Sequence, residues 1–197
     1  MTVYSYAVAR DYGFAPNPFY GYCTLATCKP IIRRVARVGD IVLGTGARQL
    51  GKEGQLIYAM RISEAMSFDE YWADDRFQPK KPNLSGSVKK RYGDNIYHQV
   101  GDIWMQSNSH HSLHDGSPNP LNIDVDTGTN RVLISNCYSY FGRIAPPLPD
   151  KFRNYHGINV CHKRGHKSRF PEELVAEIED YFEGLGRGYL GEPTSWG

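Results

Sequence analysis

The sequence predicts an α+β fold with a curved mixed sheet or a small barrel. Short runs of β-branched and aromatic residues recur along the chain, and turns rich in Gly and Pro separate them. Helical periodicity is rare, and its clearest instance lies near the C-terminus. A length of 197 residues with 40% hydrophobic residues fits a single domain, residues 1–197, with a sizeable core.

The first two elements are a strand and a short helix. β-Branched and aromatic residues dominate 2–10, which favours a strand. Pro30 suits the start of a helix, because its missing N–H has no partner in the first turn, and Gly39 suits a stop. Apolar residues at helical spacing between them predict a helix over 30–38.

A hairpin and a helical turn follow. Residues 41–43 and 55–62 are apolar runs on either side of a charged, Gly-rich loop, so they predict two paired strands. Ser67 and Glu70 have the spacing of a capping box, in which each side chain bonds the other residue's backbone N–H. A helical turn should therefore begin at Ser67.

The stretch 76–131 has poor periodicity. Because a structureless loop of this length is improbable in a compact domain, we expect short strands around 96–97 and 103–105. The runs 132–135 and 138–143 predict further strands.

The helix at 171–183 opens at Pro171 and ends at Gly184. It has one apolar stripe, which consists of Leu174, Val175, Ile178, Tyr181 and Phe182. We expect this stripe to pack on the sheet, away from a nucleic-acid surface. The alternative is a dimer interface, since exposed apolar faces associate.

The loop 11–30 combines residues that constrain a backbone. Glycines that tolerate positive φ alternate with prolines that fix φ, so the loop can hold Phe14, Asn17 and Phe19 in set orientations. Such a loop suits a binding surface. The alternative is a turn-rich crossing whose aromatic side chains fill the core.

Motifs along the chain resemble one family. They are the loop 11–30 with Cys28-Lys29-Pro30, Gly39-Asp40, Gly44-Thr45-Gly46, Tyr71-Trp72, Lys80-Lys81-Pro82, Gly93-Asp94-Asn95-Ile96-Tyr97 and Tyr140-Phe141-Gly142. With them the chain resembles the nucleotide modification associated domain family, type 2, over a core of about 3–145. The basic segment and helix at about 150–185 match less clearly. The resemblance implies a phage or bacterial setting in DNA or nucleotide modification, and it transfers no catalytic residue.

The order of the expected elements is similar to that of a known fold group. A strand, a helix, a Gly-Asp strand and a further strand running into a Ser-Glu turn resemble the barrel of the pseudouridine-synthase-and-archaeosine-transglycosylase (PUA-like) group. Several members of that group bind RNA or modified DNA bases. Because a fold does not fix a function, this resemblance supplies only a context.

Cellular location follows from cysteine usage and hydropathy. Four cysteines are too few and too scattered for a disulfide framework, so we expect reduced thiols. No segment approaches the ~20 apolar residues of a membrane span, and the start lacks the pattern of a signal peptide. We expect a soluble cytoplasmic protein.

Cys23 and Cys28 permit three interpretations. Either one could be a nucleophile, because Lys29, Arg33 and the helix start at Pro30 would favour a thiolate. Both could instead pack as small apolar residues. Zinc is disfavoured, since four residues separate the two cysteines; the further ligands considered are Cys161, His162 and His166, or His110, His111 and His114. We expect no metal and no cofactor.

Polar motifs supply other candidates. Histidines between 110 and 114 could act as acids or bases, or stay idle in a polar loop. Thr45 lies in a Gly-Thr-Gly turn that allows close approach of a base or shapes a hairpin, and it lacks the continuation of a phosphate loop. Asp94 and Asn95 offer hydrogen-bonding groups for a base edge or simply form a turn.

The net charge is only +2, but basic residues cluster in three stretches. They are Lys29 to Arg48, Lys80 to Arg91 and Lys151 to Arg169, and two or three together would attract phosphates. We therefore predict a domain that binds a nucleotide or nucleic acid, modified or unmodified, with no membrane partner. The expected ligand contacts are Phe14, Asn17, Phe19, Lys29, Arg33, Thr45, Lys81, Asp94, Asn95 and Tyr97.

The competing prediction is an enzyme that acts on a modified nucleotide or base by acid/base or cysteine chemistry. Its candidate catalytic residues are Cys28, Cys23, Asp11, Asp94 and one histidine from 110 to 114. The sequence alone leaves these two functions open. A protein-interaction scaffold, which would be indifferent to phosphate, is a third class.

Overall fold

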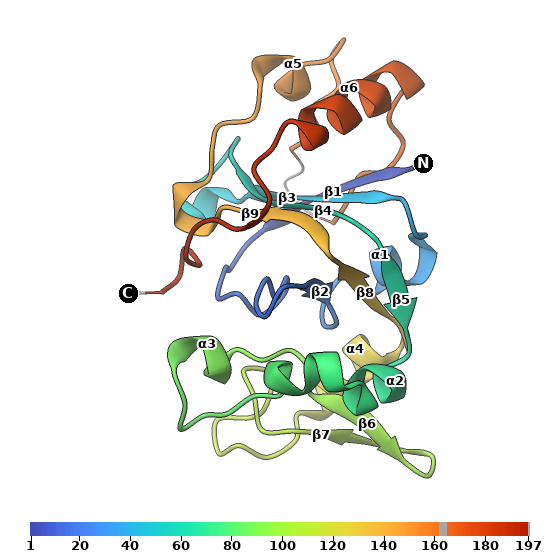
Figure 1. Cartoon of the computed structure of the whole chain (residues 1–197), viewed down its shortest axis with the longest axis vertical. Helices are drawn as coiled ribbons and strands as arrows, with labels where there is room; N and C mark the ends of the chain where they lie inside the picture. The colour runs from blue at the N-terminus through green and yellow to red at the C-terminus, as the bar shows by residue number, and fades with distance from the viewer. Residues whose placement is uncertain (162–164, 197) are drawn as a thin grey trace. The chain divides into compact units, whose positions relative to one another are not determined.

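The computed structural model describes residues 1–161 and 165–196 (Figure 1). His162, Lys163 and Arg164, which the sequence placed in a zinc alternative and a basic stretch, lie outside the described residues. The chain divides into two compact units: unit 1 is 1–12, 37–63 and 135–197, and unit 2 is 13–36 and 64–134. The described residues form a mixed α+β structure with several sheets, and none of these sheets closes into a barrel. The prediction of one domain stays a prediction.

Unit 1 contains a five-stranded sheet in the order β1-β3-β4-β9-β10. The strands are β1 (Val3–Val8), β3 (Ile41–Gly46), β4 (Leu56–Arg61), β9 (Cys137–Tyr140) and β10 (Gly188–Tyr189). β1 runs parallel to β3, whereas β3 and β4 pair antiparallel, which confirms the predicted hairpin. The register shifts between Gly44 and Thr45, so the Gly-Thr-Gly turn is a bulge inside β3.

Two helices of unit 1, α5 (Asp150–Arg153) and α6 (Glu172–Glu183), lie on one face of this sheet (Figure 1). The predicted C-terminal helix is confirmed, with Pro171 and Gly184 as its caps. Leu174, Ile178 and Phe182 are fully buried in one core cluster with residues of β1, β3 and β4. The apolar stripe therefore packs within the chain. Short 3₁₀ turns at η1 (Arg48–Leu50) and η3 (Gly142–Ile144) complete the unit.

Unit 2 is assembled from short elements. A three-stranded sheet has the order β2-β8-β5, formed by β2 (Cys23–Leu25), β8 (Val132–Ser135) and β5 (Glu64–Met66). β6 (Tyr97–Val100) and β7 (Ile103–Gln106) form a separate hairpin. The helices are α1 (Pro30–Val35), α2 (Phe68–Ala73), η2 (Asp75–Lys80), α3 (Val88–Arg91) and α4 (Pro120–Thr127). Across the described part of the chain, no helix has the length and apolar character needed to cross a membrane.

The sequence located five of the elements given for unit 2: α1, α2, β6, β7 and β8. The capping box is confirmed, because the Ser67 side chain accepts from Glu70 N–H while the Glu70 carboxylate accepts from Ser67 N–H. The helix predicted over 30–38 is shorter, since Ala36 is already extended at φ −68° and ψ 147°. Arg33, which the sequence predicted as a ligand contact, is fully buried.

Several short elements escaped prediction, among them β2, β5, α3 and α4. α4 has a weak apolar periodicity, with Leu121 and Val125 exposed, so no stripe marks it. Its start is nevertheless specified locally: Asn119 accepts hydrogen bonds from two backbone N–H groups, and Pro120 occupies the first helical position. This Asn-Pro pair was the available signal.

Replacing Ile178 by Asp is expected to lower the free energy of unfolding by at least about 3 kcal/mol, because it puts an unpaired charge into the core of unit 1. The matched control is Ala176→Asp on the exposed side of the same helix. Chemical denaturation measures both changes, and sedimentation measures the oligomeric state. A stable, folded Ile178→Asp monomer derived from a dimeric parent would contradict the internal packing.

Candidate active site

Cys28 occupies an unusual backbone position just before α1. Cys28 has φ 60° and Lys29 has φ 45°, so two successive non-glycine residues adopt the left-handed region. Residues with a Cβ rarely adopt this backbone region, and those that do are concentrated at functional sites. Pro30 then begins α1. The turn leaves the Cys28 side chain partly exposed, in contrast to the fully buried Cys23.

His111 lies between Cys28 and a carboxylate. Its Nε2 is 3.9 Å from Cys28 Sγ, and its Nδ1 is 2.8 Å from Asp126 Oδ2. The ionised carboxylate can only accept, so Nδ1 carries a proton and Nε2 is the nitrogen that exchanges a proton with sulfur. This arrangement of nucleophile, base and orienting acid is that of a cysteine-dependent catalytic triad.

The Asp126 carboxylate also fixes the cysteine backbone. Oδ1 accepts the N–H of Cys28 at 2.8 Å, while Oδ2 accepts the Tyr97 hydroxyl at 3.0 Å in addition to His111. Gln106 donates to the Tyr97 oxygen and so holds that ring in place. The Asp126 side chain is only 2% exposed. One buried carboxylate thus sets both the nucleophile and the base.

The same contacts set the charge of His111. Burial lowers the pKa of this imidazole, but the hydrogen bond to Asp126 and the contact with Cys28 raise it, and the pKa reaches about 9. His111 is therefore protonated at neutral pH. A protonated imidazole therefore lies beside Cys28 Sγ, a setting typical of nucleophilic cysteines.

Arg33 connects the Cys28 loop to the end of α4 and the residues that follow it. Its guanidinium donates to the carbonyl oxygens of Cys28, Asp126, Thr129 and Arg131 at 2.5 to 2.9 Å. Burial lowers the pKa of Arg33 to about 10, and the Asp126 charge opposes that shift, so the side chain remains a cation. The nucleophile loop and the end of α4 are therefore held by one planar group.

A second buried polar cluster surrounds Lys80 and Asp94. Lys80 Nζ donates to Asn17 Oδ1 and Thr24 Oγ1, and Asp94 accepts from Thr24 and from Tyr71. Burial lowers the pKa of Lys80 to about 8 and raises that of Asp94 to about 6, and attraction between the charges opposes both shifts. Cys23 lies in this region, and burial raises its pKa far above the usual range. The cluster is fully enclosed, so it anchors the loop from inside.

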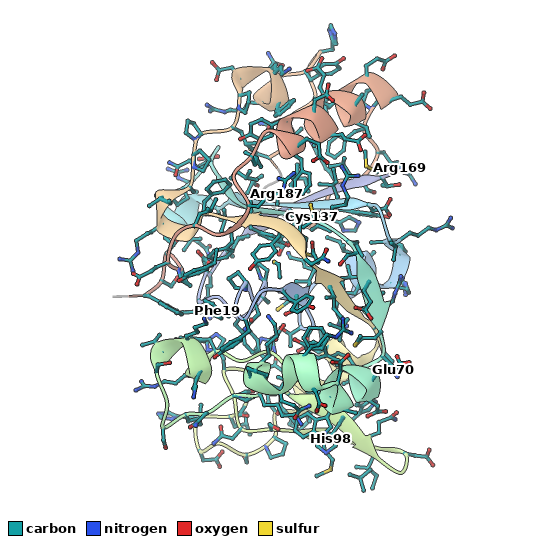
Figure 2. All side chains as sticks on the ribbon, in the orientation of Figure 1. Phe19, Glu70, His98, Cys137, Arg169 and Arg187 are labelled. Atoms are coloured by element: carbon teal, nitrogen blue, oxygen red, sulfur yellow. The ribbon has the colours of Figure 1, made fainter. Side chains whose placement is uncertain are left out.

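The side chains of several residues predicted to contact a ligand are buried within the protein. Phe14 packs on His111 with ring centroids 4.6 Å apart, and Phe19, labelled in Figure 2, is 1% exposed. Asn17, Asp94, Asn95 and Tyr97 are all fully buried. As ligand contacts these residues stay predictions.

Other predicted residues have different settings. Lys81 places its Nζ 3.6 Å from the centre of the Trp72 ring and is partly exposed. Thr45 and Asp11 belong to unit 1, where Thr45 bonds the Tyr6 carbonyl. The Asp11 carboxylate accepts from Tyr140 and from Thr194 N–H. Asp11 therefore fastens the C-terminal segment to unit 1.

Sequence reasoning reached part of the triad. Cys28 was a candidate, and His111 lay within the candidate histidines 110 to 114. Asp126 was missed because no helix was expected at 120–127. Had the Asn119-Pro120 signal been used, Asp126 would have appeared as one of two carboxylates in a predicted helix, the other being Asp124.

The side chains of Cys28, His111 and Asp126 are not arranged to bind one metal ion. Cys28 Sγ and the Asp126 carboxylate contact opposite ring nitrogens of His111, so these three groups do not converge on one point. Among residues 1–161 and 165–196 no other set of three His, Cys, Asp or Glu side chains could hold a metal ion either.

Comparison with known proteins identifies the family. The family model described as nucleotide modification associated domain 2 matches residues 1–197, the whole chain. The chain belongs to this family, which confirms the resemblance drawn from its motifs. No curated protein and no solved structure matches the chain.

Replacing Arg33 by Lys is expected to slow alkylation of Cys28 by iodoacetamide at least about tenfold, because an ammonium cannot hold four carbonyl groups in place. Peptide mass spectrometry follows Cys28 separately from Cys137 and Cys161. The matched control is Arg34→Lys, an exposed neighbour on the same helix. A folded Arg33→Lys protein that retains the wild-type rate and its pH profile would show that Arg33 does not position the thiol.

Proposed function

We propose that this member of the nucleotide modification family is a cysteine-dependent enzyme that acts on a nucleotide or on a base within nucleic acid. The observation that carries the proposal is the position of His111 between Cys28 and Asp126. Cys28 is the nucleophile, His111 moves the proton, and Asp126 orients His111. Membership in the family supplies the substrate class.

The first half of the reaction forms a bond between Cys28 Sγ and an electrophilic carbon of the substrate. The reacting pair is the Cys28 thiolate beside protonated His111, with the proton on Nε2, and the thiolate attacks the carbon. As the bond from that carbon to its leaving group breaks, protonated His111 gives the proton to the leaving group. A base carbon that carries an amino group as its leaving group fits these requirements, and so does an acyl carbon.

The second half releases the enzyme. Neutral His111 accepts a proton from water or from another acceptor nucleophile, whose oxygen or nitrogen then bonds to the substrate carbon. The sulfur–carbon bond breaks and leaves the Cys28 thiolate beside protonated His111, which is the starting state. Water gives hydrolysis, and another acceptor gives group transfer.

The surroundings of Cys28 favour an anionic substrate. Lys29 follows the nucleophile directly, and its charge interacts with that of Cys28. Burial lowers the pKa of Lys29, so this cation is partly stripped of water and would attract a phosphate or a developing oxyanion strongly. Arg33 and protonated His111 add positive charge near Cys28.

A binding domain without catalysis is the alternative. It would recognise a base through the loop 11–30 and phosphates through Lys and Arg side chains, as in a PUA-like domain of a phage or bacterial modification system. Such recognition needs aromatic and polar groups that face a ligand, whereas Phe14, Asn17 and Phe19 are at most 3% exposed. The partly exposed Cys28 beside protonated His111 supports an enzyme better than a binding domain.

Incubation of the protein with nucleotide pools and with modified DNA is expected to give a new product in nucleoside mass spectrometry. Cys28→Ser and Asp126→Asn should lower its rate at least about a hundredfold, since both remove members of the triad. Cys137→Ser, a partly exposed thiol in unit 1, is the matched control and should keep the rate.

Two results would contradict the enzyme. One is a product that persists at the wild-type rate in Cys28→Ser. The other is tight binding of nucleic acid with unchanged nucleosides across all substrates, which would restore the binding-domain alternative.

A further inference from the structure

Unit 1 contains a basic cavity that the proposed chemistry at Cys28 does not use. The cavity measures about 530 Å³, within the range of small-molecule pockets. Its lining consists of Gly157, Ile158, His166, Lys167, Ser168, Arg169 and Phe170. These described lining residues include three basic side chains and a hydroxyl but no carboxylate.

The basic wall of the cavity is fixed to the edge of the sheet. Lys167 pairs with Ser5 of β1 through two backbone hydrogen bonds of 2.8 Å, so the segment around it extends the edge strand. The Lys167 ammonium donates to the Asn159 carbonyl at 2.9 Å. His166 packs toward Tyr4, with ring centroids 6.4 Å apart. The cationic groups are therefore attached to a rigid scaffold.

The apolar lining of the cavity is equally constrained. Ile158 pairs with Tyr155 in a tight turn, and Gly157 in that turn has φ 84°. A Cβ at Gly157 would meet no atom within 4 Å, so the turn leaves open space there. Ile158 and Phe170 both pack against the core of unit 1. The cavity is thus lined by apolar side chains as well as by cationic ones.

A neighbouring hollow shows what distinguishes this cavity. It measures about 330 Å³ and shares Ser168 and Phe170, but Glu172 and Glu179 also line it. Its carboxylates would repel an anion. Arg169, by contrast, is exposed at the mouth of the basic cavity and precedes α6, whereas Arg187 follows α6 and pairs with Glu183 (Figure 2).

From these features we infer that the basic cavity of unit 1 binds a nucleotide through its phosphate. Lys167 and Arg169 contact the phosphate oxygens, and Ser168 donates its hydroxyl. Phe170 and Ile158 contact the base or sugar. The choice of a nucleotide rests on the substrate class of the proposed function.

The test titrates the full chain with a 5′-mononucleotide, the matching nucleoside and inorganic phosphate at low salt. The mononucleotide is expected to bind at least about tenfold more tightly than either fragment, because only it meets both walls. Arg169→Gln and the double variant Lys167→Gln/Arg169→Gln should weaken it progressively, by about tenfold or more in the double variant. Arg187→Gln, with the same charge change in an ion pair elsewhere on unit 1, is the control and should stay within about twofold.

Thermal melting confirms that each variant is folded, and Arg169→Gln alone serves if the double variant unfolds. Equal affinity in wild type and Arg169→Gln would overturn the inference, as would a nucleoside that binds as tightly as the nucleotide. Inorganic phosphate that binds as tightly as the nucleotide would also overturn it, because the apolar wall would then contribute nothing. Nucleotide binding by Cys28→Ser separates this result from the enzyme proposal: the cavity should bind whether or not Cys28 is a catalyst.

Discussion

The carboxylate of Asp126 accepts hydrogen bonds from three groups that come from separate segments of unit 2: the Cys28 backbone, the His111 ring and the Tyr97 hydroxyl. A buried carboxylate is costly unless donors satisfy it, so these bonds are required for the fold as well as for the site. Because His111 is oriented by the same atom that anchors Tyr97, the geometry at sulfur depends on this one side chain. The strained turn at Cys28 persists only because such contacts hold it.

Unit 2 combines buried apolar residues with buried cations. Arg33 and Lys80 are both fully buried, and each connects loops through several hydrogen-bond acceptors. Losing one partner of a buried charge typically costs about 3–5 kcal/mol, so these connections are specific to one arrangement. Unit 1 follows the other strategy, in which the apolar stripe of α6 packs on a continuous sheet.

Local signals predicted the fold well wherever they were strong. Pro171 and Gly184 bounded α6, the Ser67 capping box began α2, and the strands around β3 and β4 followed their apolar runs. Where structure depends on distant polar contacts, the sequence was less informative. Arg33 resembled a surface residue because the carbonyl groups that bury it come from residues 126 to 131.

The candidate site shows the same limit. Cys28 was recognisable from its neighbours, since a Pro-started helix and two basic residues follow it. The pairing with His111 bridges 83 positions, and Asp126 comes from a helix without an apolar stripe. No local pattern specifies the pairing of Cys28 with His111. It arises only when the loop 11–30, the β6–β7 hairpin and α4 pack together.

The most direct test of the central claim is an NMR titration of the His111 ring, with Asp126→Asn as the comparison. The account predicts a wild-type pKa of about 9, well above the ordinary value of 6.5, and a marked fall toward that value in Asp126→Asn. A His111 ring that titrates near 6.5 in both proteins would contradict it, because Asp126 would then neither orient nor charge the imidazole beside Cys28.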